Sequence, residues 1–254
     1  MKKLLGILSI VLTLIALCAC GGQEVAPTTG TAAVPTTTAT PTESTPVYPE
    51  PDKLIALTFD DGPNEHMGTI VDVLAEYDAK ASFYVIGKGV SGERAEYVKK
   101  AYAEGHEIGN HSYNHVDITL LSEAEVLSEI SLTQAAVKEA IGVEPVWYRP
   151  PFGKANDQTF ALIPMPHAYW GVSVGDGSND NIAEDRLFRA TTGAYDGAIV
   201  LLHCNDITAG VLPQILHELK MQGYEFVTTS ELFARVGEVP GNTPGVLFKD
   251  NKAE

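Results

Sequence analysis

The chain has few basic residues. Its 254 residues include 17 Lys and Arg against 33 Asp and Glu, which gives a formal net charge of −16. Proteins that bind nucleic acid contact the phosphates with clustered Lys and Arg side chains, and no extended basic run occurs in this sequence. We therefore expect no nucleic-acid partner.

Cysteine is scarce as well. Cys18 and Cys20 lie beside the N-terminal apolar segment, and Cys204 is the third cysteine of the chain. If Cys18 is removed and Cys20 is modified, as argued below, Cys204 has no partner for a disulfide. The fold must then rely on its apolar core, and a chain of this length with 44% apolar residues can bury one.

The sequence also lacks an apolar run long enough to cross a bilayer. Lys2 and Lys3 precede the apolar run Leu4–Leu17, which is shorter than the roughly 20 residues of a membrane-spanning helix and is typical of a secretion signal. The following "LCAC" resembles a bacterial lipobox, which implies cleavage before Cys20 and a lipid on its sulfur. We expect an extracellular, membrane-anchored lipoprotein, with ordinary secretion as the alternative.

Periodic structure is missing near both ends of the chain. Residues 21–50 are rich in Thr, Pro and Ala, which is typical of a disordered, extended tether. Residues 237–254 have little periodicity and are interpreted as a tail, in which Val246–Phe248 could pack. The predicted division is a signal peptide over 1–20, a linker over 21–50, one folded domain over 51–236 and the tail.

Within the domain, short apolar runs alternate with longer segments of helical period. Strands are predicted at 54–59, 81–86, 106–109, 146–149, 168–174, 198–203 and 225–228. Helices are predicted at 67–78, 93–103, 183–191, 210–222 and 229–235, and another after a capping-box pattern at Ser122 and Glu125. Regular alternation of strand and helix predicts an α/β fold whose parallel strands form a distorted (β/α)7 barrel.

Polar side chains gather where the predicted strands end. They are Asp60 and Asp61 after the first strand, His111 and His115 after the third, Arg149 at the end of the fourth, the segment Ser173–Asp176 after the fifth and His203 at the end of the sixth. Because barrels of this type carry their active sites at the carboxyl ends of the strands, we expect these groups to converge.

The two adjacent acids need an explanation of their own. Asp60 and Asp61 repel each other, so a positive group should lie near them. Strand alternation would send them to opposite faces, so the backbone must turn sharply at Asp61–Pro63 if both serve one site.

"GNHSYNH" supplies a candidate source of that positive charge. His111 and His115 are four residues apart, and two imidazoles with an Asp from the first strand make the three protein ligands of a catalytic zinc-type site. The spacing alone is weak evidence, because seven histidines occur in the chain and a pair of solvated or core histidines is the alternative.

Four motifs in order along the chain, "TFDDGP", "HSYNH", "RPPFG" and "LLH", resemble those of the polysaccharide deacetylases, the NodB-homology group of carbohydrate esterase family four. The resemblance covers Lys53–Arg235. It implies a divalent metal, with zinc expected and cobalt, nickel or manganese as alternatives.

It also implies a role for each matching residue. Asp60 matches the catalytic base, Arg149 matches the partner of that base, and His203 matches the general acid. Asp61, His111 and His115 match the metal ligands. Phe152, at a position usually held by Tyr, matches a backbone donor to the oxyanion, and Leu201 matches a wall of the acetyl pocket.

The resemblance implies hydrolysis of an acetyl group on a polysaccharide. Asp60 would take a proton from the attacking water and His203 would protonate the departing amine. We expect an N-deacetylase acting on N-acetylglucosamine of peptidoglycan or of a chito-oligosaccharide, and no protein partner. An O-acetyl esterase on xylan and a catalytically weakened glycan-binding lipoprotein are the alternatives.

The family pattern breaks at the fifth strand. Members usually show Trp-x-Val-Asp-x-x-Asp-Trp, whereas "WGVSVGDG" places Ser173 at the first Asp and Gly177 at the second Trp. We expect the support of the acid histidine to be weakened, unless Asp176 or Asp206 supplies it. The loss of such support costs roughly 10- to 100-fold in activity, which favours a slowed enzyme over an inactive one.

Two further features have competing interpretations. Cys204 follows His203, but neighbours on a strand point to opposite faces, so a buried Cys is favoured over a thiol nucleophile. Trp147, Tyr148 and Trp170 are candidates for glycan platforms or for core packing.

Overall fold

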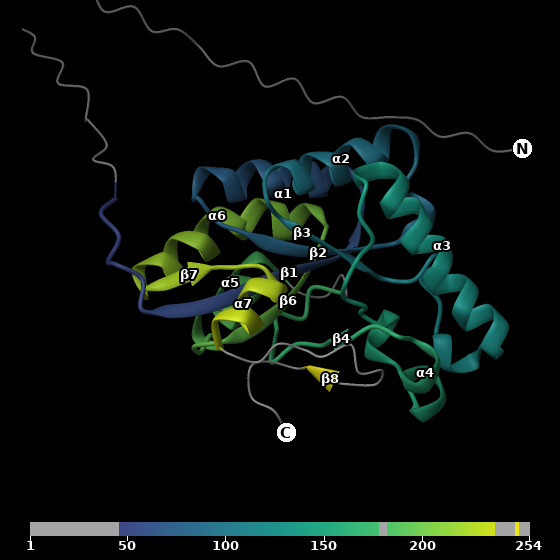
Figure 1. Cartoon of the computed structure of the whole chain (residues 1–254). Helices are drawn as coiled ribbons and strands as arrows, with labels where there is room; N and C mark the ends of the chain where they lie inside the picture. Colours follow the sequence, from purple (N-terminus) through teal and green to yellow (C-terminus); the bar gives the residue numbers. More distant parts are fainter. Residues whose placement is uncertain (1–45, 178–181, 237–246, 249–254) are drawn as a thin grey trace, which may run out of the picture. The chain divides into compact units, whose positions relative to one another are not determined.

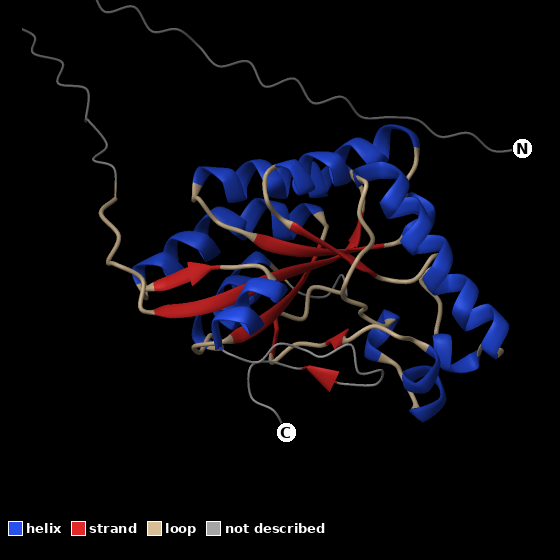
Figure 2. Ribbon diagram, viewed as in Figure 1, coloured by secondary structure: helices blue, strands red, loops and turns tan. Residues whose placement is uncertain are grey.

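A parallel sheet centred on its first strand organises the molecule. The computed structural model describes residues 46–177, 182–236 and 247–248, which belong to the compact unit Pro46–Glu254. Figures 1 and 2 show the arrangement of its elements. The strands are β1 (Lys53–Gly62), β2 (Ala81–Val85), β3 (Glu107–Asn110), β4 (His167–Ala168), β5 (Val172–Ser173), β6 (Ala198–His203), β7 (Tyr224–Phe226) and β8 (Leu247–Phe248). The helices are α1 (Glu65–Glu76), α2 (Gly92–Ala103), α3 (Glu123–Ile141), α4 (Asp157–Leu162), α5 (Ala183–Thr192), α6 (Asp206–Met221) and α7 (Thr229–Val236), with 3-10 turns at Gly87–Gly89, Ile118–Leu120 and Pro151–Gly153.

Parallel pairing follows the order β3-β2-β1-β6-β5, with β7 paired to the first residues of β1. Single bridges through Tyr148 join Asn110, the last residue of β3, to His167 of β4, and β4 pairs with β8. After β4 the chain forms β5, which pairs with β6. The fold is thus the expected α/β arrangement of parallel strands, consistent with a distorted barrel.

Two predicted strands differ from the structure. The strand expected at 146–149 is reduced to the bridge residue Tyr148. The strand expected at 168–174 is broken into β4 and β5, because the carbonyl oxygens of Ala168 and Tyr169 accept hydrogen bonds from Arg149, at 2.8 and 3.1 Å, instead of from a neighbouring strand. A buried guanidinium therefore takes the backbone acceptors that would have continued the ladder.

Side-chain alternation along β1 separates two cores. Ile55, Leu57 and Phe59 pack outward against α1, α2 and α6, which lie along one face of the sheet in Figure 1. Ala56 belongs to the inner cluster, which α7 closes with Leu232 and Phe233. Residues of even number on β1 therefore face the barrel interior.

The longest helix begins as predicted. The carboxylate of Glu125 accepts a hydrogen bond from the backbone N–H of Ser122 at 2.8 Å, and the pair closes a capping box at the start of α3. Val126 and Val137 of the predicted apolar face are buried.

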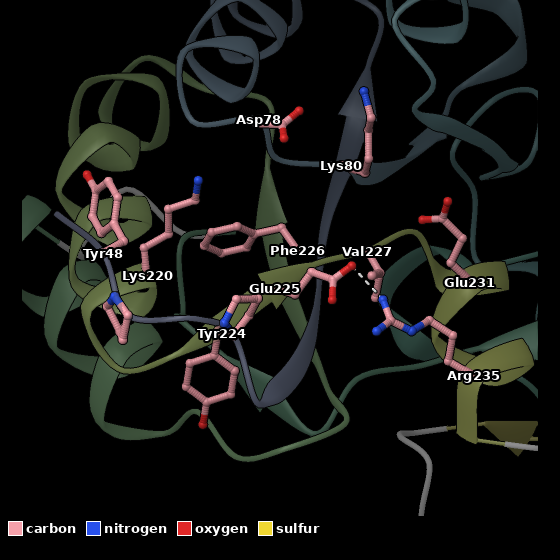
Figure 3. Close-up of a pocket in the computed structure, with 12 residues that line it drawn as sticks. Tyr48, Asp78, Lys80, Lys220, Tyr224, Glu225, Phe226, Val227, Glu231 and Arg235 are labelled. Carbon is pink, nitrogen blue, oxygen red and sulfur yellow. Dashed lines mark hydrogen bonds and ion pairs between the residues drawn. The ribbon is translucent and has the colours of Figure 1, made fainter. Parts of the chain in front are cut away.

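A pocket of about 470 Å³ lies at the amino ends of β2 and β7. This amino-end pocket, drawn in Figure 3, is lined by Tyr48, Pro49, Pro51, Asp78, Lys80, Lys220, Tyr224, Glu225, Phe226, Val227, Glu231 and Arg235. Tyr48 falls in the stretch predicted as linker, yet its hydroxyl lies 3.1 Å from Nδ1 of His217 on α6.

The predicted signal peptide, the lipidation site Cys20 and the linker up to residue 45 lie outside the described residues. Of the helices in the described part of the chain, none is both long and apolar enough to cross a membrane. In the predicted tail, Leu247–Phe248 is described and forms β8.

Candidate active site

The acids that end β1 face one pocket because the backbone turns between them. Asp60 continues the inward alternation and stands opposite His203 in the register of β1 with β6. At Asp61 the backbone adopts φ of 69°, and the register of β1 with β2 shifts between Asp60 and Gly62. This bulge is the sharp turn that the sequence required, and it brings both carboxylates to the same cavity.

Arg149 forms a buried ion pair with Asp60. Both side chains are buried, and Nη1 of Arg149 lies 2.8 Å from Oδ1 of Asp60. The same nitrogen donates to Oγ1 of Thr58 at 2.7 Å, and the guanidinium lies 4.0 Å from the ring centre of Tyr84. Oδ1 of Asp60 is thus fixed by an ion pair, while Oδ2 faces His111 at 3.7 Å from its Nε2.

His111, His115 and Asp61 form a three-ligand cluster. Oδ1 of Asp61 lies 3.2 Å from Nε2 of His115 and 3.6 Å from Nε2 of His111. Nδ1 of His111 is 2.7 Å from the carbonyl oxygen of Arg149, which can only accept, so Nδ1 carries the proton and Nε2 presents a lone pair. Burial and the neighbouring His111 lower the pKa of His115, which favours the neutral form that binds metals.

The cluster fits a divalent cation on a further observation. Oδ1 of Asp61 is buried and has no hydrogen-bond partner in the described part of the chain. An unpaired buried carboxylate oxygen is costly, and a cation between it and two imidazole lone pairs would satisfy it. The ligating atoms all lie within 4.8 Å of one another.

The loop that carries the histidines is held by residues that the sequence gave no reason to select. Glu129 of α3 is buried and accepts hydrogen bonds from the backbone N–H groups of Tyr113 and Asn114 at 2.9 and 2.7 Å. Oδ1 of Asn110 accepts from the N–H of Ser112 at 2.9 Å. Glu129 lies on the next helix, and no local motif links it to the loop.

His203 is supported by Asp176, one of the two residues that the sequence offered in place of Ser173. Oδ1 of Asp176 lies 2.8 Å from Nδ1 of His203, and Oδ2 accepts from the backbone N–H of His203 at 2.7 Å. Ser173 is exposed at the pocket rim, so its substitution removes no contact to the imidazole, and Asp206 begins α6 without supplying this contact. Of the two candidates that the sequence offered, Asp176 takes the role.

The charges around His203 set its protonation. Burial lowers the pKa of His203, but the hydrogen bond and charge of Asp176, together with the charges of Asp60 and Asp61, outweigh it, so the net pKa lies above the ordinary value of 6.5. A raised pKa favours the protonated imidazole that the role of general acid requires.

These groups share one cavity of about 400 Å³, the mouth pocket, at the carboxyl ends of the strands. It is lined by Asp60, Asp61, His111, His115, Pro150, Phe152, Gly153, Trp170, Ser173, Gly175, Gly177, Leu201 and His203. Arg149 lies beneath it. All eight residues predicted for the active site therefore lie in or directly below one cavity.

The aromatic candidates separate by burial. Trp147 and Tyr148 are buried, so core packing was the correct interpretation for both. Trp170 lines the mouth pocket. Phe152 is 63% exposed, and its ring centre lies 4.7 Å from that of His115, so it covers one side of the cluster of possible metal ligands.

Cys204 is a core residue, as favoured. It is buried, and burial raises the pKa of its thiol well above the ordinary value, so it remains protonated and unreactive.

Backbone strain is concentrated at the mouth pocket. Five non-glycine residues of the described chain have positive φ, and four of them belong to this region: Asp61, Ser112, His115 and Phe152. A left-handed conformation at such residues costs on the order of 1–3 kcal/mol each and persists only where surrounding contacts enforce it. The molecule bears this cost where its polar groups converge.

Comparison with known proteins agrees with this geometry. The family model described as "Polysaccharide deacetylase" matches residues 48–164. The peptidoglycan-N-acetylglucosamine deacetylase PgdA of Listeria monocytogenes is 41% identical over 184 residues, which cover 72% of this chain and 39% of that protein. This chain thus corresponds to about two fifths of that relative.

Two other relatives are matched over nearly their whole length. A peptidoglycan-N-acetylglucosamine deacetylase of Bacillus cereus is 38% identical over 195 residues, which cover 72% of this chain and 90% of that protein. The structure of a family 4 acetyl xylan esterase from Clostridium thermocellum, in complex with a cobalt ion, superposes with a TM-score of 0.76 at 32% identity and covers 79% of this chain and 100% of that one. The chain belongs to the polysaccharide deacetylase family.

Proposed function

We propose that this protein is a metal-dependent hydrolase that removes N-acetyl groups from a cell-wall polysaccharide, with N-acetylglucosamine of peptidoglycan or of a chito-oligosaccharide as the substrate unit. The observation that carries the proposal is that three features meet at one cavity of about 400 Å³. They are the ion pair of Asp60 with Arg149, the cluster of three possible metal ligands, and His203 with its partner Asp176. The relatives named as peptidoglycan-N-acetylglucosamine deacetylases support the substrate class.

The cation would be held by Asp61, His111 and His115. Three protein ligands leave a coordination position open, as in catalytic zinc sites. When bound, a divalent cation would supply Lewis acidity that makes water a better nucleophile and the acetyl carbonyl a better electrophile. Zinc is the proposed metal; the cobalt ion in the Clostridium relative supports cobalt as a substitute, and nickel and manganese are the other candidates.

Asp60 would accept a proton from water through Oδ2, because Oδ1 is occupied by Arg149. The water oxygen then bonds to the acetyl carbon, and the charge that develops on the carbonyl oxygen would be received by the backbone N–H of Phe152. Leu201 would contact the acetyl methyl group at the cavity wall.

His203 would complete the reaction. As the C–N bond breaks, Nε2 of His203 would give its proton to the departing nitrogen, while Nδ1 stays bonded to Asp176. The products are acetate and a free amino sugar, so one water is consumed for each acetyl group removed. Because an amine is a poor leaving group without protonation, this step needs a protonated imidazole.

The place of action proposed is the cell surface. The relatives named for peptidoglycan act on an extracellular polymer, which supports export. Lipidation of Cys20 would hold the domain at a membrane through the predicted linker, and its test is mass spectrometry of the protein extracted from membranes.

The activity is tested with the purified domain loaded with zinc or cobalt. Acetate release is measured on an N-acetylated chito-oligosaccharide and on peptidoglycan, with the chelated protein as the control. We expect acetate from at least one of them with metal, and none after chelation. A metal-loaded, folded protein that releases no acetate from either would contradict the proposal.

A second candidate is an O-acetyl esterase, favoured by the similarity to the acetyl xylan esterase of Clostridium thermocellum. An alkoxide leaves more readily than an amine, so this reaction depends less on His203. The ratio of the rates on acetylated xylan and on the chito-oligosaccharide distinguishes the two candidates.

A further inference from the structure

A second polar layer lies behind His203. Asp176 is 4% exposed, and its carboxylate accepts three hydrogen bonds. Two come from His203, at Nδ1 and at the backbone N–H, and the third comes from Oγ1 of Thr208 at 2.7 Å. Thr208 is buried in the first turn of α6. The carboxylate is therefore fixed from the side that faces away from the cavity.

Arg186 of α5 lies behind this layer. It is 2% exposed, and its Nη1 donates to Oγ1 of Thr208 at 3.1 Å and to Oδ1 of Asn205 at 2.7 Å. Among the residues that the structure describes, no carboxylate forms an ion pair with it, and its Nε has no hydrogen-bond partner. A buried guanidinium without a contacting counter-ion is costly, so its position needs a reason beyond packing.

The chemistry of the guanidinium fixes the direction of the hydrogen bonds that it makes with Thr208 and Asn205. Arginine has donors only, so Oγ1 of Thr208 must accept from Arg186 and its single proton is left for Oδ2 of Asp176. The same constraint turns the amide oxygen of Asn205 toward Arg186, where it also accepts from the N–H of Thr208 at 2.9 Å. Nδ2 of Asn205 is then left to donate to the carbonyl oxygen of Asp176 at 3.2 Å.

Asp176 is consequently surrounded by donors, with a positive charge one hydroxyl away. With these donors on its oxygens, the carboxylate accepts from Nδ1 of His203, which keeps a proton on Nδ1 and directs Nε2 into the mouth pocket. If Arg186 were apolar, the hydroxyl of Thr208 could rotate away and Asp176 would lose one of its three donors.

We propose that Arg186 is a positioning residue for the acid step, acting through Thr208 and Asp176 to hold the imidazole of His203 in the orientation that protonates the leaving nitrogen. The inference rests on the proposed deacetylase function. It assigns no contact between Arg186 and substrate.

The test compares two leaving groups. Arg186→Met and Thr208→Val are assayed on an N-acetylated chito-oligosaccharide, whose amine needs a proton to leave, and on 4-nitrophenyl acetate, whose phenolate leaves without one. We expect kcat on the oligosaccharide to fall roughly 10- to 100-fold with KM unchanged, and the rate on the aryl ester to stay unchanged. Equal losses on both substrates in folded variants, or no loss on either, would overturn the proposal.

Matched controls separate positioning from folding. Thr208→Ser retains the hydroxyl and should retain both activities. Arg189→Met removes an exposed arginine from the same helix and should also change neither rate. Thermal unfolding of each variant is recorded, and if Arg186→Met does not fold, Thr208→Val with its serine control carries the test.

A second measurement needs no substrate. The Nδ1 proton of His203, assigned in the NMR spectrum with His203→Gln, should move upfield and exchange faster with water in Thr208→Val and Arg186→Met. An unchanged proton in both variants would overturn the proposal. If the wild-type protein releases no acetate but this proton responds as expected, the proposed function fails and the positioning role stands.

Discussion

The two ends of the parallel strands carry pockets of similar size and opposite character. The amino-end pocket is the larger, about 470 Å³ against about 400 Å³ for the mouth pocket. Two of its charged groups have simple partners. Arg235 pairs with Glu225, both partly exposed (Figure 3). Nζ of Lys80 donates to the carbonyl oxygen of Glu104 at 2.6 Å. In the mouth pocket, by contrast, Oδ1 of Asp61 is buried and has no hydrogen-bond partner among the described residues.

The contrast shows that volume does not identify a functional site in this molecule. The ion pair of Arg235 with Glu225 is exposed to solvent and could be exchanged at little cost. At the mouth, buried and half-buried ionisable groups from β1, from the loop after β3 and from β6 are brought together with strained backbone at Asp61 and His115, which a stable fold alone does not require. Energetic cost, concentrated in one place, is the better indicator.

The largest effect on the rate is expected from the loss of His203, the proposed proton donor to the leaving group. His203→Gln removes the proton donor, so the rate of acetate release from a chito-oligosaccharide should fall roughly 100- to 10,000-fold. Circular dichroism serves as the control for folding. A rate within a few-fold of wild type would show that His203 is not the acid.

A smaller loss of activity is expected from a change at Asp176, the partner of His203. Asp176→Asn keeps the shape but removes the negative charge, so kcat should fall roughly 10- to 100-fold. Because the pKa of His203 is raised in the folded protein, protonation of its imidazole contributes to the free energy of unfolding. This contribution is fully present below the ordinary pKa of 6.5 and is lost as pH rises through the folded-state pKa.

The same variant therefore has a directional pH signature. Without Asp176, burial lowers the pKa of His203, and the alkaline limb of the kcat profile should move to lower pH. A limb that does not move, or that moves to higher pH, would contradict the assignment. The profile is measured at saturating metal so that metal loss does not imitate the effect.

Ser173→Asp should have almost no effect on the acid step. The sequence suggested that Ser173 replaces a needed acid, but Asp176 already occupies the position beside Nδ1 of His203. We expect kcat on the chito-oligosaccharide to stay near the wild-type value. A large gain would mean that the support of His203 is incomplete, and would revive the weakened-enzyme interpretation.

The smallest effect is expected at the amino-end pocket. Glu225→Gln breaks the exposed ion pair with Arg235, and exposed pairs contribute about 0–1 kcal/mol to the free energy of unfolding. Denaturant unfolding should show a change within that range, and acetate release should be unchanged. A clear loss of activity would remove the contrast between the two pockets.

Local patterns predicted much of the fold and most of the site. Alternation along β1 and the capping box of α3 depend on neighbours in sequence and were recovered, as were the residues of the four motifs. The break between β4 and β5 was missed, because it depends on the guanidinium of Arg149 from a distant segment.

Support within the site depends on the same kind of distant contact. The family pattern has Asp at the positions of both Ser173 and Asp176, but it could not say which of the two positions faces His203. The chain turns at Gly175, where φ is 75°, and Asp176 is the residue that reaches the imidazole. The contribution of Glu129 to the histidine loop could not be predicted either, since it joins segments 15 residues apart by side-chain bonds alone.

The central claim is that Asp60 and Asp61, adjacent on β1, have different tasks. The most direct test measures bound metal per chain and acetate release together in the wild type, Asp60→Asn and Asp61→Asn. We predict that Asp60→Asn keeps its metal and loses hydrolysis, and that Asp61→Asn loses both. Hydrolysis near the wild-type rate in a metal-loaded Asp60→Asn protein, or full metal occupancy in Asp61→Asn, would contradict the account.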